Sequence, residues 1–347
     1  MAPAWSVRIA SIAAMLISAA ACDSTSDAES TTTGVVTTTA PATTAPATTT
    51  PATTTPATTT PAAAVDPVGV VSHGSIMVDG RERTYRLYVP ASLPPGSAPA
   101  PLFIGLHGGG GWGDQFASTN DVEGLAESNG FIVVHPDGVT LAGGQGGVWN
   151  GGICCARAVR ENVDDVAFID SLITRLATEL GVDPRRTYAF GHSNGAIMSF
   201  RLACELSDRI VGIGAVAGLL GVEPCAPSQP VSLIQIHGTL DRNIPLAGGV
   251  GQESTVGVDF PPPPDGAAAM AVIDGCTTSD LTAEGDIATD SYESCAAGSG
   301  VEFVTITSAN HAWPGATQVA TRSVGPGYAG YDATAAIVEF LLAHPRP

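Results

Sequence analysis

The chain has 347 residues, enough for one large domain or two average ones, and it is strongly acidic. Lys and Arg together number 14 against 33 Asp and Glu, which gives a formal net charge of -19. The sequence contains no lysine, and this excludes Schiff-base lysine enzymes, P-loop nucleotide hydrolases and protein kinases. The negative charge also argues against nucleic-acid binding, because a phosphate backbone would be repelled. With 44% apolar residues, most of the chain is able to bury a core.

Residues 1–22 have the pattern of a signal peptide for export. Arg8 precedes an apolar run over residues 9–21, which is too short for a permanent membrane span. Small residues stand directly before Cys22, as in the lipobox of bacterial lipoproteins, where the cysteine is acylated, although Ala19 replaces the usual leucine. Cleavage after the alanines by ordinary signal peptidase is the alternative. We therefore expect an exported protein, either secreted or held in the cell envelope by a lipid on Cys22.

Residues 23–66 consist mainly of Thr, Pro and Ala, with the sequence Pro-Ala-Thr-Thr-Thr repeated at 51–55 and 56–60. Such a segment has almost nothing apolar to bury, so it predicts a disordered, extended linker. No second shift of composition follows, and residues 67–347 are predicted to form one domain.

The expected elements of this domain alternate between strands and helices. A hairpin is predicted around Asp79-Gly80, and a helix begins at Asp164 or Asp165 and ends at Gly181. Short apolar runs of the buried parallel-strand type follow the hairpin at 102–106, 131–135, 187–190, 210–216, 231–237 and 301–307. A final helix is expected over 332–342. The pattern predicts an α/β fold with a mostly parallel, twisted sheet, helices on both faces and an antiparallel hairpin at its start.

One G-x-S-x-G motif occurs in the chain, Gly191-His192-Ser193-Asn194-Gly195. It lies between the predicted strand that ends at Phe190 and an apolar helix that runs to about Cys204. A serine on such a strand-to-helix turn needs glycines two before and two after it, because side chains there would collide with the neighbouring strand and helix. An ordinary Gly-rich turn is the alternative, but the flanking elements favour Ser193 as a nucleophile.

A serine nucleophile needs an imidazole base and an orienting carboxylate. Asp241 follows the strand predicted at 231–237, and His311 follows the strand predicted at 301–307. The chain order Ser193, Asp241, His311 is that of α/β-hydrolases. The alternatives for the acid, none directly after a clear strand, are Asp265, Asp274 and Asp286. We expect these three to lie in surface loop or short helix.

A glycine run, Leu106-His107-Gly108-Gly109-Gly110-Gly111, follows the strand predicted at 102–106. Its backbone N–H groups carry no Cβ beside them, which suits an oxyanion hole of the His-Gly-Gly-Gly kind. The candidates for the hole are His107, Gly108 and Gly109 together with Asn194, the residue after the nucleophile. Phosphate binding by this run is disfavoured by the missing lysine.

With these motifs in this order, the sequence resembles secreted esterases of the polyhydroxybutyrate depolymerase and feruloyl esterase type, within carbohydrate esterase family one. The resemblance extends over most of 73–344 and includes Trp149-Asn150, Cys154-Cys155 and Val163-Asp164-Asp165-Val166 besides the motifs above. It implies an α/β-hydrolase fold and hydrolysis of carboxylic esters without a cofactor or metal. The sequence departs from the family at His135, where tyrosine is more common.

Aromatic residues near the motifs are candidates for the substrate pocket. Trp112, Trp149 and Trp313 each lie within a few residues of a motif, and His135 is a fourth candidate; core packing is the alternative for any one of them. Only about fourteen residues separate the strands predicted at 210–216 and 231–237, which leaves no room for a large lid there. We therefore expect an open cleft that accepts a polymer chain or a bulky ester.

Seven cysteines in an exported chain predict disulfides. Without Cys22, six cysteines remain and allow fifteen pairings. We favour Cys276 with Cys295, Cys204 with Cys225, and a bridge between the neighbours Cys154 and Cys155. A metal site is the competing interpretation, but no paired ligand spacing supports it.

The sequence therefore predicts an exported, monomeric serine esterase that acts on polyhydroxybutyrate-like, feruloyl or acetyl polysaccharide, or short-chain esters. Two alternatives stay open. One is a cell-envelope acyltransferase, in which a sugar hydroxyl replaces water, and the other is a catalytically silent lipoprotein that only binds polymer.

Overall fold

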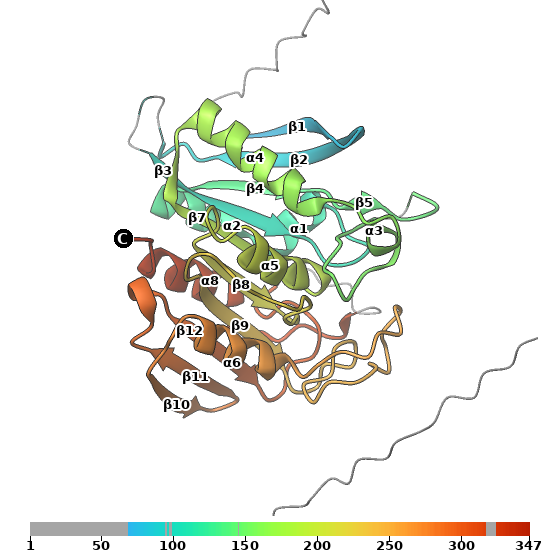
Figure 1. Ribbon diagram of the computed structural model, residues 1–347, viewed down its shortest axis with the longest axis vertical. Coiled ribbons are helices and arrows are strands. Elements are labelled where there is room, and N and C mark those ends of the chain that lie inside the picture. The colour runs from blue at the N-terminus through green and yellow to red at the C-terminus, as the bar shows by residue number, and fades with distance from the viewer. Residues whose placement is uncertain (1–68, 94–95, 97–98, 145, 317–323) are drawn as a thin grey trace, which may run out of the picture. The chain divides into compact units, whose positions relative to one another are not determined.

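A computed structural model describes residues 69–93, 96, 99–144, 146–316 and 324–347 of the chain (Figure 1). The predicted signal peptide over 1–22, including Cys22, and the predicted linker over 23–66 lie outside these residues. The described part builds a ten-stranded sheet in the order β1-β2-β4-β3-β7-β8-β9-β12-β11-β10.

The sheet begins with the predicted antiparallel hairpin. Strands β1 (Val70–Val78) and β2 (Arg81–Val89) pair with Val78 opposite Arg81, so only two residues form the turn. Both turn residues have positive φ, 49° at Asp79 and 72° at Gly80. This conformation matches the right-handed twist of the strands and favours Asp-Gly at the two positions.

Six strands form the parallel centre of the sheet, and each predicted apolar run overlaps one of them. They are β3 (Ala100–Leu106), β4 (Ile132–Pro136), β7 (Val182–His192), β8 (Gly212–Val216), β9 (Ser232–Gly238) and β12 (Val301–Ile306). β3, β4, β8 and β9 are buried along their whole length, because helices cover the sheet on both faces. Parallel pairing also places the carboxyl ends of all six strands at one edge.

Helices cover the two faces of this sheet (Figure 1). One face carries α4 (Asp165–Leu180), α5 (Asn194–Glu205) and α6 (Pro263–Ile273), and their buried side chains share one apolar cluster. The other face carries α1 (Gly113–Asn120), α2 (Val122–Asn129) and α8 (Ala333–Ala343), which pack in a second cluster. The predicted α/β-hydrolase arrangement, a mostly parallel sheet wrapped on both faces after an antiparallel hairpin, is confirmed.

The predicted ends of α4 are those of the structure. The carboxylate of Asp164 accepts a hydrogen bond from the N–H of Ala167 at 2.8 Å, and so caps the helix. Gly181 ends it in the left-handed conformation, with φ of 68°.

The segment between α6 and β12 differs from the expected surface loop. It contains β10 (Thr278–Glu284) and β11 (Ile287–Glu293), an antiparallel hairpin that extends the sheet beyond β12. All seven residues of β10 are exposed, so the strand has no buried apolar face. Backbone pairing with β11 defines it instead.

Smaller elements complete the described part of the chain. They are β5 (Val139–Thr140), β6 (Gly147–Val148), α3 (Ala156–Arg160) and a 3-10 turn over Ala296–Gly298. The six cysteines pair as Cys154–Cys155, Cys204–Cys225 and Cys276–Cys295, which is the pairing favoured from the sequence. Three disulfides fit an exported protein. Among the described residues, no helix has the length and apolar character that crossing a membrane requires.

Candidate active site

Ser193 lies on a sharp turn between β7 and α5, at the carboxyl edge of the sheet. Its φ of 54° and ψ of -119° are strained for a residue with a side chain. A Cβ on Gly191 would stand 2.4 Å from backbone atoms of Gly195, and one on Gly195 would stand 2.1 Å from the carbonyl oxygen of Leu106 in β3. The two glycines are therefore required for the turn, and the turn holds the Ser193 hydroxyl at the surface of a cavity.

The side chains of His311 and Asp241 meet Ser193 at this edge. The Nε2 atom of His311 is 2.8 Å from Oγ of Ser193, and its Nδ1 atom is 2.7 Å from Oδ2 of Asp241. A carboxylate only accepts, so Nδ1–H donates to Asp241 and Nε2 is left to accept the proton of the hydroxyl. The three side chains come from the segments that follow β7, β9 and β12. The last two segments contact each other directly, because the N–H of Leu240 donates to the carbonyl oxygen of Ala309 at 2.9 Å.

The environment of Asp241 favours its ionised form. Its other oxygen, Oδ1, accepts the N–H groups of Asn243 and Ile244, each at 2.8 Å. Burial alone would raise the pKa of the Asp241 carboxyl, but the charge and hydrogen bond of His311, together with His237 and the Ile244 N–H, hold this pKa below its usual value. An ionised carboxylate beside Nδ1 orients the imidazole and stabilises its protonated form.

Two further histidines hold the backbone around the triad of side chains. His192 donates from Nε2 to the carbonyl oxygen of His311 at 2.7 Å, and His237 donates from Nε2 to the carbonyl oxygen of Ile244 at 2.9 Å. Burial lowers the pKa of His192 to about 4, and burial also lowers the pKa of His237. Both rings are therefore neutral at pH 7, and they fix the loops that carry His311 and Asp241.

The glycine run after β3 lies against the turn that carries Ser193. A Cβ on Gly108 would be 3.6 Å from Cβ of Ser193, and one on Gly109 would be 3.8 Å from Cβ of Asn194. His107 is buried, and its Nε2 accepts the N–H of Gly138 at 2.9 Å while its Nδ1–H donates to the carbonyl oxygen of Gly108 at 2.8 Å. Burial lowers the pKa of His107 to about 4, which keeps this neutral tautomer.

The hydrogen bonds of the Gly108 carbonyl fix the direction of the N–H that follows it, that of Gly109. Besides His107, this oxygen accepts the N–H of Gly111 at 2.9 Å. In a trans peptide the following N–H, that of Gly109, points opposite to the carbonyl. The N–H of Gly110 donates to the carbonyl oxygen of Gly147 at 2.8 Å. Gly110 and Gly111 are thus excluded as donors to an oxyanion hole, and Gly109 is a candidate because its N–H points away from the bonded carbonyl of Gly108.

A cavity of about 400 Å³ opens over Ser193 and His311. Its lining includes Cys154, Cys155 and the side chains of Ile197, Ile244 and Phe260, which belong to one apolar cluster. It also includes Gln115, Phe116, Thr119 and Trp313. Part of the wall comes from the long connection between β9 and α6, including residues 253–256.

The four aromatic candidates for the pocket have different positions. Trp313 lines the cavity, but Trp149 and His135 are completely buried outside its lining, and Trp112 lines a separate surface cavity. Trp149 packs in the apolar core, where its Nε1–H donates to the carbonyl oxygen of His107 at 3.0 Å. The expectation that Trp112, Trp149 and His135 line one pocket with Trp313 is corrected. Two of these side chains are buried in the core, and Trp112 lines a different cavity.

The rival carboxylates do not lie beside His311. Asp265 is exposed in the first turn of α6, Asp274 is buried at the end of this helix, and Asp286 forms part of the β10–β11 turn. In the described part of the chain, no group of three or more His, Cys, Asp or Glu residues is arranged to hold a metal ion.

Sequence reasoning missed His192 and the wall built by residues 239–262. His192 lies inside the serine motif, and its place next to Ser193 and before a helix is itself a signal that it supports the site. The wall carries Pro and Gly without any apolar period, so its position depends on contacts such as the Gly249–Phe260 bridge.

Comparison with known proteins extends this description. A family described as phospholipase/carboxylesterase matches residues 93–255. Feruloyl esterase B of Piromyces equi is 31% identical over 62% of this chain and 40% of its own length, and feruloyl esterase C of Emericella nidulans is 30% identical over 52% of this chain and 62% of its own. The chain thus spans less than two thirds of these relatives.

Solved structures agree with the topology. The acetyl xylan esterase from Aspergillus awamori superposes with a TM-score of 0.51 over 72% of this chain and 96% of its own, at 14% identity, a similarity that concerns the fold. The predicted resemblance to feruloyl esterases is confirmed by the relatives in sequence. The chain has the α/β-hydrolase fold and is similar in sequence to feruloyl esterases.

Proposed function

We propose that this protein is a serine carboxylic-ester hydrolase in which Ser193 is the nucleophile, His311 the general base and Asp241 the orienting acid. The observation that carries the proposal is the continuous hydrogen-bonded chain from Oγ of Ser193 through the His311 ring to Oδ2 of Asp241, with distances of 2.8 and 2.7 Å. Its position beside a cavity on an α/β-hydrolase sheet adds support.

In the first half of the reaction, the Ser193 oxygen attacks the ester carbonyl while His311 takes the hydroxyl proton at Nε2. The carbonyl oxygen becomes an oxyanion, which the N–H groups of Gly109 and Asn194 stabilise. The N-terminus of α5 behind Asn194 adds a favourable partial positive charge. Collapse of this intermediate releases the alcohol, which receives the proton from His311, and leaves an acyl group on Ser193.

In the second half, water replaces the alcohol. His311 removes a proton from the water, whose oxygen attacks the acyl carbonyl, and the same N–H groups stabilise the second oxyanion. The acid is released when the proton returns to Ser193. Each half-reaction leaves the charge on Asp241 unchanged, because this carboxylate stabilises the imidazolium without taking its proton.

The substrate we propose is an ester with a bulky or polymeric component. The cavity of about 400 Å³ has an apolar wall of Ile197, Ile244 and Phe260 that suits a hydrocarbon or aryl group. The names of the relatives, feruloyl esterase and acetyl xylan esterase, favour acylated polysaccharides, and polyhydroxybutyrate-like and short-chain esters belong to the same proposal.

The setting of the activity is also part of the proposal. We infer export by the leader over 1–22, a linker over 23–66, and a monomeric catalytic domain over 67–347 that is either secreted or tethered through acylated Cys22. The disulfides support export, because they persist in oxidising compartments.

The test is a panel of p-nitrophenyl, feruloyl, acetyl-xylan and hydroxybutyrate esters, with the purified full chain and the Ser193→Ala variant. We expect hydrolysis by the wild type only, and a fluorophosphonate label on the wild type only. Hydrolysis that is unaffected by Ser193→Ala overturns the proposal. Transfer of the acyl group to an added sugar in preference to water supports the acyltransferase alternative, and the absence of both labelling and turnover supports the polymer-binding alternative.

A further inference from the structure

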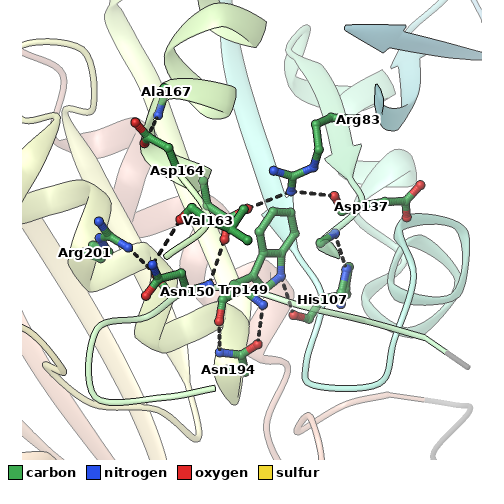
Figure 2. A network of polar contacts seen from close by, with 12 residues as sticks. Arg83, His107, Asp137, Trp149, Asn150, Val163, Asp164, Ala167, Asn194 and Arg201 are labelled. Atoms are coloured by element: carbon green, nitrogen blue, oxygen red, sulfur yellow. Dashed lines mark hydrogen bonds and ion pairs between the residues drawn. The ribbon is translucent and has the colours of Figure 1, made fainter. Parts of the chain in front are cut away.

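A short segment outside the cavity connects the two parts of the candidate oxyanion hole. We call residues Trp149 and Asn150 the strap. They follow β6 and are buried, with 0% and 4% of their surface exposed. Neither residue lines the cavity that holds Ser193. Figure 2 shows that the strap lies at the centre of a network of polar contacts from several elements.

The first connection runs from the strap to the residue after the nucleophile. The N–H of Trp149 donates to Oδ1 of Asn194 at 2.8 Å, and Nδ2 of Asn194 donates back to the carbonyl oxygen of Trp149 at 3.1 Å. The side-chain amide of Asn194 thus pairs with both main-chain polar groups of Trp149 (Figure 2). Aspartate cannot reproduce this pairing because it lacks the donor, and an aliphatic side chain offers neither bond.

The second connection runs from the strap to the loop after β3. The Nε1–H of Trp149 donates to the carbonyl oxygen of His107 at 3.0 Å, and the two rings lie with their centroids 5.0 Å apart. His107 in turn holds the peptide between Gly108 and Gly109 through its Nδ1–H. One tryptophan therefore contacts both segments that contribute an N–H to the proposed oxyanion hole.

The strap is itself fixed from the opposite side. The N–H of Asn150 donates to Oδ2 of Asp165 at 2.7 Å, and Arg83 of β2 pairs with Oδ1 of the same carboxylate at 2.7 Å. Arg201 of α5 donates to the carbonyl oxygen of Asn150 at 2.7 Å, while Nδ2 of Asn150 donates to the carbonyl oxygen of Val163 at 3.0 Å.

This anchoring is rigid because the charges are buried and paired. The Arg83 and Asp165 side chains are 4% and 0% exposed, so loss of either partner would leave an unpaired buried charge. Any other position of the strap would break these buried contacts. Residues of β2, α4 and α5 together therefore fix where the strap lies. A buried polar network whose members all have partners rigidifies what it holds.

From this geometry we infer that the strap positions the oxyanion hole: Trp149 and the side chain of Asn194 fix the separation between the Gly109 N–H and the Asn194 N–H. The inference rests on the proposed function. The two side chains are positioning residues, because they act through the backbone groups that face the substrate. An oxyanion forms only during the reaction, so their effect belongs to the transition state and not to substrate binding.

Two variants of the full chain test this inference. Trp149→Phe removes the bond to the His107 carbonyl and leaves the strap backbone unchanged. Asn194→Ala removes both side-chain bonds and keeps the backbone N–H of residue 194 itself. For each we expect kcat to fall by about 10- to 1000-fold with KM changed less than about threefold, since one oxyanion donor is worth about 100- to 1000-fold. The inhibition constant of a trifluoromethyl ketone, which forms an oxyanion on the serine, should rise by the same factor as kcat falls.

The pH profile of kcat should stay that of the wild type, because Asp241 and His311 are not touched. The control is Leu172→Ala, a buried side chain of α4 that is not part of this network and loses packing energy only. All variants are assayed at the same interval below their own melting temperatures. If Leu172→Ala lowers kcat as much as the strap variants do, the effect is one of stability and the inference is overturned.

Two other results separate this inference from the proposed function. If the wild type needs Ser193 for hydrolysis while both strap variants keep wild-type kcat and inhibitor affinity, the strap has no positioning role and the proposed function stands. If hydrolysis does not need Ser193, the proposed function fails and takes the inference with it. A fall in kcat with a matching rise in the inhibition constant in either variant supports the inference.

Discussion

Replacing Asp241 by asparagine changes the charge beside His311 with almost no change in shape. In the structure, Oδ1 of Asp241 accepts two backbone N–H groups at 2.8 Å, and Oδ2 accepts Nδ1–H of His311 at 2.7 Å. The amide oxygen of the introduced asparagine must occupy the Oδ1 position, because an NH₂ group there would face two donors and leave them unsatisfied at about 1–3 kcal/mol each. The NH₂ group therefore faces His311.

The orientation of this NH₂ group determines the tautomer of the base. Nδ1 of His311 becomes the acceptor, so the ring proton moves to Nε2, which then faces the Ser193 hydroxyl and is unable to take its proton. Such a tautomer error in a serine triad lowers kcat by about 10⁴, equivalent to about 5.4 kcal/mol of activation free energy. KM should change little, since Asp241 does not line the cavity.

The assay is the hydrolysis of p-nitrophenyl acetate by the purified full chain at neutral pH, with the melting temperature measured in parallel. Asp265→Asn is the matched control, because this carboxylate is exposed in the first turn of α6 and its loss should leave kcat unchanged. An Asp241→Asn variant that keeps more than a tenth of wild-type kcat would refute the assignment of the orienting acid. So would inactivation by the same change at Asp286 or Asp274.

Three further predictions concern the nucleophile, stability in acid and the membrane anchor. Ser193→Ala should lower the hydrolysis of p-nitrophenyl acetate by about 10⁴ or more and leave the circular dichroism spectrum unchanged; near wild-type turnover would contradict the nucleophile assignment. Burial lowers the pKa of His135 to about 3, below the unfolded value of 6.5, so its contribution to stability is full above pH 6.5 and is lost as the pH falls from 6.5 toward 3. His135→Gln should therefore flatten the pH dependence of the free energy of unfolding by about 1.4 kcal/mol per pH unit, measured by urea unfolding between about pH 6 and 4.5, and an unaltered slope would show that this ring does not titrate as its burial implies. Cys22→Ser should move the protein from the membrane fraction to the medium, because two or three acyl chains anchor stably; wild-type protein that is wholly in the medium and unacylated by mass spectrometry would argue for ordinary cleavage.

The fold could be predicted from the sequence wherever local chemistry and burial agree. Gly181 ends α4 because it adopts a left-handed conformation, and Asp79-Gly80 forms the hairpin turn for the same reason. The continuous apolar runs of the central strands indicate that these strands are buried on both faces, and the runs can be seen in the sequence alone. These elements needed no knowledge of their tertiary partners.

The hairpin β10–β11 could not be predicted in this way. Residues of β10 such as Leu281 alternate with polar neighbours but are exposed on both sides, so their pattern carries no buried face. The strand exists because the backbone of β11 pairs with β12 on one side and with β10 on the other. A sheet edge of this kind is defined by hydrogen bonds between segments, and a single sequence does not encode them as a hydrophobic period.

In the candidate site, too, some residues could be placed from the sequence and others could not. Ser193, Asp241 and His311 follow strands whose carboxyl ends must meet in a parallel sheet, so their proximity could be predicted from strand order alone. Trp149 could not be placed, because an indole near a motif suits a pocket wall as well as a core. The Nε1–H bond to the His107 carbonyl, which draws the ring inward, arises from two segments 42 residues apart.

The histidines of the chain illustrate why partner chemistry decides function. His107 and His192 each donate to a backbone carbonyl, and burial keeps both rings neutral, so they hold loops in place without exchanging protons at pH 7. His311 has a carboxylate at Nδ1 and a hydroxyl at Nε2, the two partners that the proposed general base requires. A carbonyl partner has no net charge to stabilise an imidazolium, whereas Asp241 has one. A histidine whose ring N–H reaches a peptide oxygen is thus suited to holding a loop, and one whose ring N–H reaches a carboxylate is suited to the proposed role of a base.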